Sequence, residues 1–158
     1  MSSQFRPAAD WELANIIADA AVRQTPLEIV GSGTKQTVGR PVQAAASIST
    51  RGLSGIMLHE PNELVMSARA GTLLSDVEGQ LAKKGQMLPF EPVDLGPLLG
   101  KEAGLGTIGA VFATNISAAR RIHSGAARDH LLGVRAVTGY GQTINVGGRV
   151  MKNVTGYD

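Results

Sequence analysis

Cysteine is absent from this chain of 158 residues, and aromatic residues make up only 4% of it. Without cysteine the chain can form no disulfide, bind no zinc through thiolates, hold no iron–sulfur cluster of its own and use no cysteine nucleophile. The scarcity of aromatic side chains argues against a stacking surface for single-stranded nucleic acid. No apolar run approaches about 18 residues, so we expect no membrane-spanning helix. The first seven residues carry no apolar signal core, which predicts a cytoplasmic protein that would reach a membrane only through partner subunits.

Long runs of one charge are also missing. The net charge is +2, but residues 1–102 carry nine Lys/Arg and eleven Asp/Glu, giving −2, whereas residues 103–158 carry six Lys/Arg and two Asp/Glu, giving +4. No cluster of Lys or Arg is long enough to propose nucleic-acid binding. The basic part is also rich in glycine, since ten of the 20 glycines lie in its 56 residues. This combination suits an anion site, although ordinary solvated arginines would explain the charge equally well.

Groups that bind metal or catalyse reactions by themselves are not recognisable. The three histidines, His59, His123 and His130, share no spacing that is typical of metal ligands. Neither a Ser/His/Asp arrangement nor a pair of carboxylates stands out. We therefore predict no metal site and no catalytic side chain, and we expect a cofactor to supply any chemistry.

Apolar periodicity predicts a mixture of helices and short strands. Helical spacing runs from a cap at Asp10 to about Arg23, and again from a cap at Thr72 to a stop at Gly85. Residues 107–114 could form one or two further helical turns. Short apolar segments predict strands at residues 27–30, 47–50, 55–58, 64–70 and 86–90, and a hairpin of residues 131–138 with 142–146.

The composition of the sequence changes between Pro89 and Gly106, where three prolines and four glycines indicate a long connection. We therefore predict an α+β fold of two α/β lobes, with residues 1–90 in the first lobe, 91–106 in the connection and 107–158 in the second lobe. The last six residues resemble the start of an element rather than a polar tail, which predicts that the second lobe is incomplete at the C-terminus.

Two glycine-bearing loops are the candidate functional segments. The first loop, Gly31-Ser32-Gly33-Thr34-Lys35, directly follows an apolar strand, and the second loop is Thr107-Ile108-Gly109-Ala110, with Asn115 further along. Small residues allow successive backbone N–H groups to point at one anion and allow that anion to come close. The start of a helix at Thr107 would add amide donors. We predict that both loops face one hollow that holds a pyrophosphate, which implies a dinucleotide, and we expect a flavin.

Each candidate also has an ordinary structural interpretation. The first loop could be a plain turn, and the second could be a helix start without a ligand. Lys35 could approach a phosphate or be solvated, and Asn115 could bind a phosphate or a ribose or end the short helix. Arg120 and Arg121 could face an acidic partner or the cofactor, or be a solvated pair, and Arg128 with Asp129 could form an internal ion pair or loop brace. Lys152, Asn153 and Tyr157 could line the flavin edge or serve in packing.

Several blocks within residues 25–158 occur together in an order and spacing that is specific, although any one of them alone is weak. The blocks are Gly39-Arg40-Pro41-Val42, Pro61-x-Glu63-Leu64-Val65, Ala68-Arg69-x-Gly71-Thr72, Gly85-Gln86-Met87-Leu88-Pro89-x-Glu91-Pro92, Ala119-Arg120-Arg121, Arg128-Asp129-x-x-Leu132-Gly133 and Val150-Met151-Lys152-Asn153-Val154-x-Gly156-Tyr157-Asp158. By these blocks the chain resembles the vanillyl-alcohol-oxidase-type flavoproteins, whose FAD domain is of the PCMH type. Within that family it resembles the E subunits of bacterial glycolate oxidases.

This resemblance implies a two-lobed FAD domain whose pyrophosphate lies between the first and second loops. It implies oxidation of a 2-hydroxy acid, glycolate to glyoxylate, with a hydride passing from the α-carbon to the flavin. It also implies a complex with a second flavoprotein subunit and an iron–sulfur subunit. In related subfamilies a histidine of the first loop is bonded to the flavin. Thr34 and Lys35 stand there in this chain, so the resemblance implies non-covalent FAD.

The sequence departs from the family pattern in three places. Gly109-Ala110 replaces a Gly-Gly pair, and Ser117-Ala118 replaces Ser-Gly. If Ala110 needed a positive φ, its Cβ would cost about 1 kcal/mol and weaken FAD binding. The family also continues past Gly156-Tyr157-Asp158 with more sheet and a substrate domain, so we expect this stretch of chain to be inactive alone.

Two other functions stay open. The chain could be a non-catalytic structural or electron-relay subunit that partners a separate catalytic flavoprotein; the altered second loop and the lack of acid–base residues favour this, and the intact first loop opposes it. A nicotinamide-binding Rossmann unit would need a Gly-x-Gly-x-x-Gly motif, but Gln36 stands where the third glycine belongs.

Overall fold

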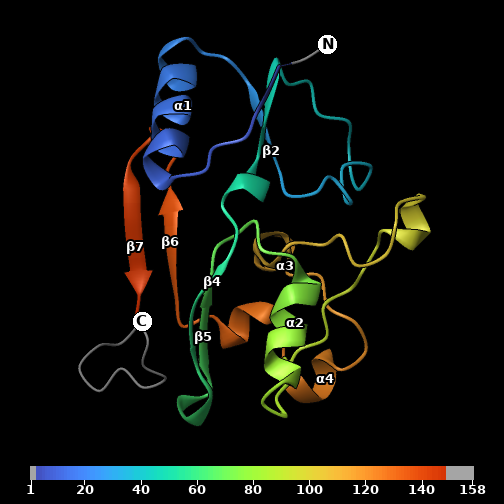
Figure 1. Cartoon of the computed structure of the whole chain (residues 1–158). Coiled ribbons are helices and arrows are strands. Elements are labelled where there is room, and N and C mark those ends of the chain that lie inside the picture. The colour runs from blue at the N-terminus through green and yellow to red at the C-terminus, as the bar shows by residue number, and fades with distance from the viewer. Residues whose placement is uncertain (1–2, 149–158) are drawn as a thin grey trace.

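The computed structural model describes residues 3–148 of the chain (Figure 1). Its first sheet has three short parallel strands in the order β1-β3-β2, formed by Ser3–Phe5, Ala46–Ser49 and Leu27–Val30. Strand β2 was predicted in full and β3 nearly so, whereas β1 is too short and polar to be recognised from the sequence. Ile48 of the central strand is fully buried and pairs in register with residues of both neighbouring strands. It anchors this sheet.

Helix α1, Asp10–Val22, connects β1 to β2 and confirms the predicted helix. Its cap differs from the prediction, because the N-cap residue is Ala9 and no side chain caps the helix. Glu12 instead accepts a hydrogen bond from the preceding backbone, at 2.8 Å. Asp10 pairs with Arg135, at 3.0 Å between Oδ2 and Nε, and so joins the helix to a later part of the chain.

A second sheet consists of antiparallel strands β4, Ile56–Glu60, and β5, Val65–Ala68, and leads into helix α2, Leu74–Ala82. Thr72 does not cap α2 as predicted, because the helix begins later, with Leu73 as its N-cap. The Thr72 hydroxyl accepts a hydrogen bond from the Gly55 amide at 2.9 Å and donates one to a carbonyl of its own turn at 2.7 Å. Thr72 therefore ties the end of β5 to the start of β4.

Residues 86–90 do not form the predicted strand. Pro89 has no amide donor and would interrupt the ladder of a sheet. The side-chain amide of Gln86 donates to the Pro61 carbonyl at 2.7 Å and holds the segment to the β4–β5 turn. The segment ends with Phe90, which is buried and serves as a packing anchor.

The connection contains one short 3-10 helix, η3, Pro97–Leu99, which lies on a segment that projects from the molecule (yellow in Figure 1). The chain then enters helix α3, Ile108–Thr114, with Thr107 as its N-cap, and this confirms the predicted helical turns. Two short helical segments follow: α4 at Arg121–Ser124 and η4 at Ala127–His130.

The predicted hairpin is confirmed: β6, Gly133–Val137, pairs antiparallel with β7, Thr143–Gly147. It lies beside α1, as Figure 1 shows, and its turn approaches the helix so closely that a Cβ at Gly141 would lie 2.6 Å from the Ala14 carbonyl oxygen. The predictions for residues 149–158, namely those on Lys152, Asn153, Tyr157 and the incomplete end of the second lobe, lie outside the described residues.

Two clusters of buried apolar residues form the core around α2 and α3. In the first, Val77 and Leu81 of α2 pack with Ile108 of α3. In the second, Phe90 and Val111 pack with a residue of η4. Both clusters include α3, which follows the connection, and the first reaches back across it to α2. The division into lobes at residues 91–106 stays a prediction. Within residues 3–148 no helix combines the length and the apolar character that crossing a bilayer requires.

Candidate functional site

The first loop leaves the carboxyl end of β2 and is held there by side chains of the neighbouring strand. The Ser49 hydroxyl donates to the Gly31 carbonyl at 3.0 Å, and the Thr50 hydroxyl donates to the Val30 carbonyl at 3.3 Å. Gly33 has a φ of +74°, a conformation that favours glycine. The loop is therefore fixed at its start and turns sharply within three residues.

The second loop begins with Thr107, which is only 1% exposed and caps α3. The Thr107 hydroxyl accepts from the Ala110 amide at 3.4 Å. The Ile108 amide donates to the Thr72 carbonyl and the Gly109 amide to the Ala70 carbonyl, both at 2.9 Å. These two amides are thus engaged within the protein, so they are not the free donors that the sequence pattern led us to expect.

Ala110 lies inside α3 and is not among the described residues with a positive φ. The expected penalty for a Cβ in a left-handed conformation therefore does not arise. The glycine that the fold needs here is Gly109, because a Cβ at that position would lie 2.7 Å from the Ala70 carbonyl oxygen. The change from Gly-Gly to Gly-Ala is compatible with this backbone.

The two loops meet in space. A Cβ at Gly31 would lie 2.4 Å from the Thr107 hydroxyl oxygen, well inside contact distance. Gly31 also lines a pocket of about 350 Å³, together with other residues of the first loop, Leu105 and two arginines. The predicted second-loop residues 107–110 are not among its lining residues. Its volume is in the range of small-molecule sites. The lining residues with polar side chains are Gln4, Arg6, Ser32, Gln36, Ser49 and Arg51.

The pocket lies at the carboxyl edge of the parallel sheet. Arg6 follows β1, Gly31 follows β2 and Arg51 follows β3, so all three strands end at the pocket. Open sheets with parallel strands bind ligands at this edge. Sequence reasoning missed both arginines, although each stands one or two residues past the end of a strand. For Arg6 the missing information was the position of β1.

Two features of the pocket fit a diphosphate group. The Ser32 hydroxyl oxygen is buried and has no hydrogen-bond partner among residues 3–148. In the described part of the chain, two arginines and no carboxylate line the pocket. An unpaired donor and positive charge at a bare backbone turn are the features that bind phosphate oxygens.

The other predicted residues lie apart from this pocket. Thr34 is buried and Lys35 is not one of the lining residues. Asn115 ends α3, with a left-handed φ of 49°, and its side-chain oxygen accepts from the Arg128 amide at 3.1 Å. A helix of seven residues is about 10 Å long, so Asn115 stands at the far end of α3 from Thr107.

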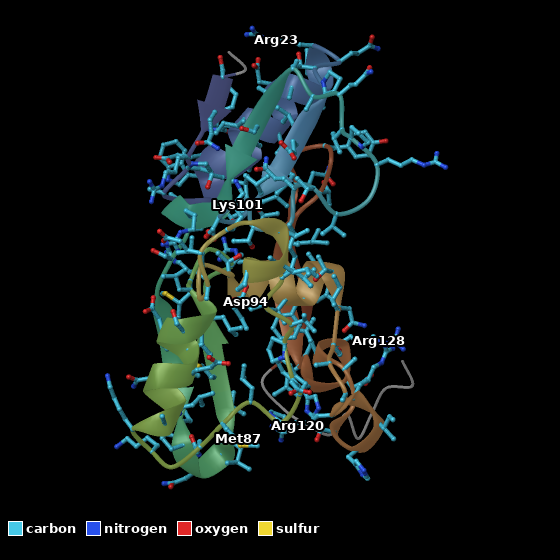
Figure 2. All side chains as sticks on the ribbon, turned by 90° about the vertical axis from the view of Figure 1, so that its right-hand side faces the viewer. Arg23, Met87, Asp94, Lys101, Arg120 and Arg128 are labelled. Atoms are coloured by element: carbon cyan, nitrogen blue, oxygen red, sulfur yellow. The ribbon has the colours of Figure 1, made fainter. Side chains whose placement is uncertain are left out.

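Asp94 organises the loop that leads to Leu105. Its carboxylate accepts hydrogen bonds from the Gly104 amide at 2.8 Å and from the Gly96 amide at 2.9 Å. These bonds, with the Gly104 bond the stronger influence, hold the pKa of Asp94 below its ordinary value, and the positive charge of Lys35 adds to this. Asp94 lies near the middle of the molecule in Figure 2.

A dependence on acid follows from the Asp94 bonds. A carboxylate whose pKa is lowered by folding stabilises the protein above its unfolded pKa of about 3.9, and this contribution is lost as the pH falls through the lower folded value. We expect the unfolding midpoint to fall more steeply below about pH 4 in the parent than in Asp94→Asn. The difference should be small, because the side chain is exposed. Thermal unfolding followed across this pH range checks it, and parallel curves would contradict it.

The arginines after α3 lie away from the pocket. Arg120 lies toward the end of the molecule opposite Arg23 (Figure 2), and its backbone amide donates to Glu91 at 3.0 Å. Arg128 pairs with Asp129 at 3.6 Å, and Asp129 also accepts from the Ala126 amide at 2.8 Å. The Arg128–Asp129 pair is therefore a brace within its loop, which confirms the ionic role among the predicted interpretations.

Comparison with known proteins gives the family. A model of the FAD binding domain matches residues 3–147. The glycolate oxidase subunit GlcE of Escherichia coli (strain K12) is 45% identical over 135 residues, which are 85% of this chain and 36% of that protein. A D-lactate dehydrogenase of Archaeoglobus fulgidus is 28% identical over 153 residues, which are 96% of this chain and 32% of that protein. The chain thus spans about a third of the length of these relatives.

A solved structure supports the fold. Alkyldihydroxyacetonephosphate synthase superposes with a TM-score of 0.72 at 18% identity, covering 96% of this chain and 27% of that one. At this identity the likeness concerns the fold alone. It agrees with the match to the family model, which extends over nearly all of the described residues. The chain belongs to the FAD binding domain family.

Proposed function

We propose that the chain binds FAD non-covalently, with the diphosphate in the pocket between the first loop and Leu105. The observation that supports this most directly is that the first loop lines a pocket together with Leu105, while its Gly31 packs against Thr107 at the start of the second loop. The orphaned Ser32 hydroxyl and the two arginines supply donors and charge for phosphate oxygens. Thr34 and Lys35 stand where related subfamilies carry the histidine that bonds to flavin, so no covalent link is proposed.

The proposed reaction is the oxidation of a 2-hydroxy acid, with glycolate as the first candidate substrate. Two relatives are named for such reactions, a glycolate oxidase subunit and a D-lactate dehydrogenase. Bound FAD would supply the acceptor for the hydride from the substrate α-carbon. This chain would position the cofactor through its backbone turns and arginines. A second flavoprotein subunit and an iron–sulfur subunit are the proposed partners, and any cluster must lie in a partner because this chain has no cysteine.

A non-catalytic subunit is the second candidate. Its support is the composition of the pocket lining, which within residues 3–148 contains no histidine, carboxylate or lysine that could move a proton. In that case FAD would serve as a structural group or an electron relay, and a partner would oxidise the substrate. Glycolate turnover with a dye acceptor, measured with and without the partner subunits, separates the two candidates.

The FAD proposal is tested by titrating the purified chain with FAD. We expect saturable quenching of flavin fluorescence and a shifted flavin absorbance band, because the bound isoalloxazine leaves bulk water. After acid or heat precipitation the flavin should remain in the supernatant, since no covalent bond is proposed. If the chain leaves FAD fluorescence unchanged both alone and with its partner subunits, the cofactor proposal fails. Flavin that stays with the precipitate would contradict only the non-covalent mode.

A further inference from the structure

We propose that Arg51 is the residue that pairs with the diphosphate in this pocket, and that it makes the site selective for ligands that carry phosphate. The proposal rests on the proposed function, because it assigns one side chain to the cofactor's charge. Arg51 follows β3 within a short 3-10 helix, η1, Thr50–Gly52, and lines the pocket beside the first loop.

The structure holds the Arg51 side chain in place. Its Nη1 donates to the Gly71 carbonyl at 2.6 Å, and its backbone amide donates to the Ser49 hydroxyl at 3.4 Å. One arm of the guanidinium is therefore fixed, and its remaining N–H groups donate to no other group among residues 3–148. A guanidinium has five donors in a planar fork that matches phosphate oxygens, so a fixed first arm orients the rest.

Arg51 has no counter-charge in the described part of the chain. The ion pairs of residues 3–148 join Arg23 to Asp19, Arg128 to Asp129 and Arg135 to Asp10, and no carboxylate of this range lines the pocket. The residue is half-buried, so part of its hydration is lost. A partly desolvated cation that is not paired with an anion is costly, and an anionic ligand would remove this cost.

The Ser32 hydroxyl points to the same ligand. It is buried, lacks a partner among the described residues and belongs to the same pocket lining as Arg51. Two unsatisfied donors of different kinds, one neutral and one cationic, can be satisfied together by the oxygens of one diphosphate. Arg6 also lines the pocket, but its side chain is exposed to solvent. We therefore assign the specific pairing with the diphosphate to Arg51, and to Arg6 only a contribution to the positive potential of the pocket.

The test compares three ligands on the full chain: FAD, ADP and adenosine. Arg51→Met should weaken both FAD and ADP about tenfold or more, because a hydrogen-bonded charge is removed, and should leave the weak binding of adenosine unchanged. The salt dependence of ADP binding should flatten in this variant. Arg23→Met is the matched control, since it removes the same charge from an exposed residue at the far end of α1 (Figure 2).

The outcomes are distinguishable. If Arg51→Met binds FAD and ADP as tightly as Arg23→Met does, the Arg51 assignment is overturned while the FAD proposal stands. If the parent binds neither FAD nor ADP, both alone and with its partner subunits, both proposals fail. Unfolding midpoints without ligand show whether the variant is folded. If Arg51→Met does not fold, Arg51→Lys decides, because it keeps the charge but loses the fork. The assignment expects weaker ADP binding than in Arg23→Met, and parent-level affinity would overturn it.

Discussion

Gly31→Ala is expected to lower both the stability of the chain and its affinity for FAD. The new Cβ would lie 2.4 Å from the Thr107 hydroxyl oxygen and 3.2 Å from its methyl carbon, and Thr107 is only 1% exposed. Overpacking of this kind costs about 1–3 kcal/mol. If the first loop moves away to relieve the clash, FAD binding must restore the original loop conformation at the same free-energy cost. FAD should therefore bind about 10- to 100-fold more weakly.

A double-mutant cycle makes this prediction specific. Thr107→Ala removes the two atoms that the new methyl group would strike, so Gly31→Ala should be less harmful in that background. We expect a favourable coupling of about 0.5–3 kcal/mol, although Thr107→Ala itself loses a cap worth about 1 kcal/mol. Gly106→Ala is the matched control, because a Cβ there meets nothing within 4 Å. Urea unfolding and FAD titration measure both effects, and additive behaviour would show that the loops do not touch.

Gly71→Ala is expected to destabilise the fold more than Gly31→Ala or Thr107→Ala does, by about 3 kcal/mol or more. A Cβ at this buried position would lie 1.9 Å from the Thr50 carbonyl oxygen and 2.8 Å from that of Leu53. Both obstacles are backbone atoms, so no side chain can rotate away. The Gly71 amide also donates to the Leu53 carbonyl at 2.7 Å, which fixes the two segments together.

The control for Gly71→Ala is Gly79→Ala in the exposed part of α2. A Cβ at Gly79 meets nothing within 4 Å. Alanine in a helix interior is more favourable than glycine by about 0.5–1 kcal/mol, so this variant should be slightly more stable than the parent. Denaturant unfolding followed by circular dichroism compares the two. A Gly71→Ala chain that unfolds within about 0.5 kcal/mol of the parent would contradict the close packing of Gly71 against Thr50 and Leu53.

Local patterns predicted the elements that depend on local sequence. The helix at α1, the strand at β2, the turns at α3 and the late hairpin follow from periodicity, a threonine cap and glycine-rich turns. Pro89 explains locally why the strand predicted at residues 86–90 is absent, but the other failures have long-range causes. Strand β1 exists only because it pairs with β3. Asp10 and Thr72 were expected to cap helices, but partners far along the chain bind them instead.

The site was predictable to a similar degree. Glycine patterns identified the first loop and Thr107, and the structure places these segments in contact, although their role in binding FAD stays a proposal. The sequence could not show that the Ile108 and Gly109 amides are already bonded to carbonyls near α2. It also could not show that Arg51 lines the same pocket, because that depends on how η1 packs against Gly71. A sequence shows which residues carry hydrogen-bond donors, but only the tertiary structure shows which of these donors are free to bind a ligand.

The contact between Gly31 and Thr107 also constrains when during its lifetime the protein can hold a ligand. These residues are separated by about half of the chain, and joining distant segments carries a large loop-closure entropy, so their encounter belongs to the late steps of folding. A ligand that binds only the closed form, present at about 100 times its Kd, adds about 2.7 kcal/mol to the native state. If that ligand is FAD, cells short of flavin would contain more of the open, protease-sensitive chain. The supply of flavin would then affect the abundance of the protein.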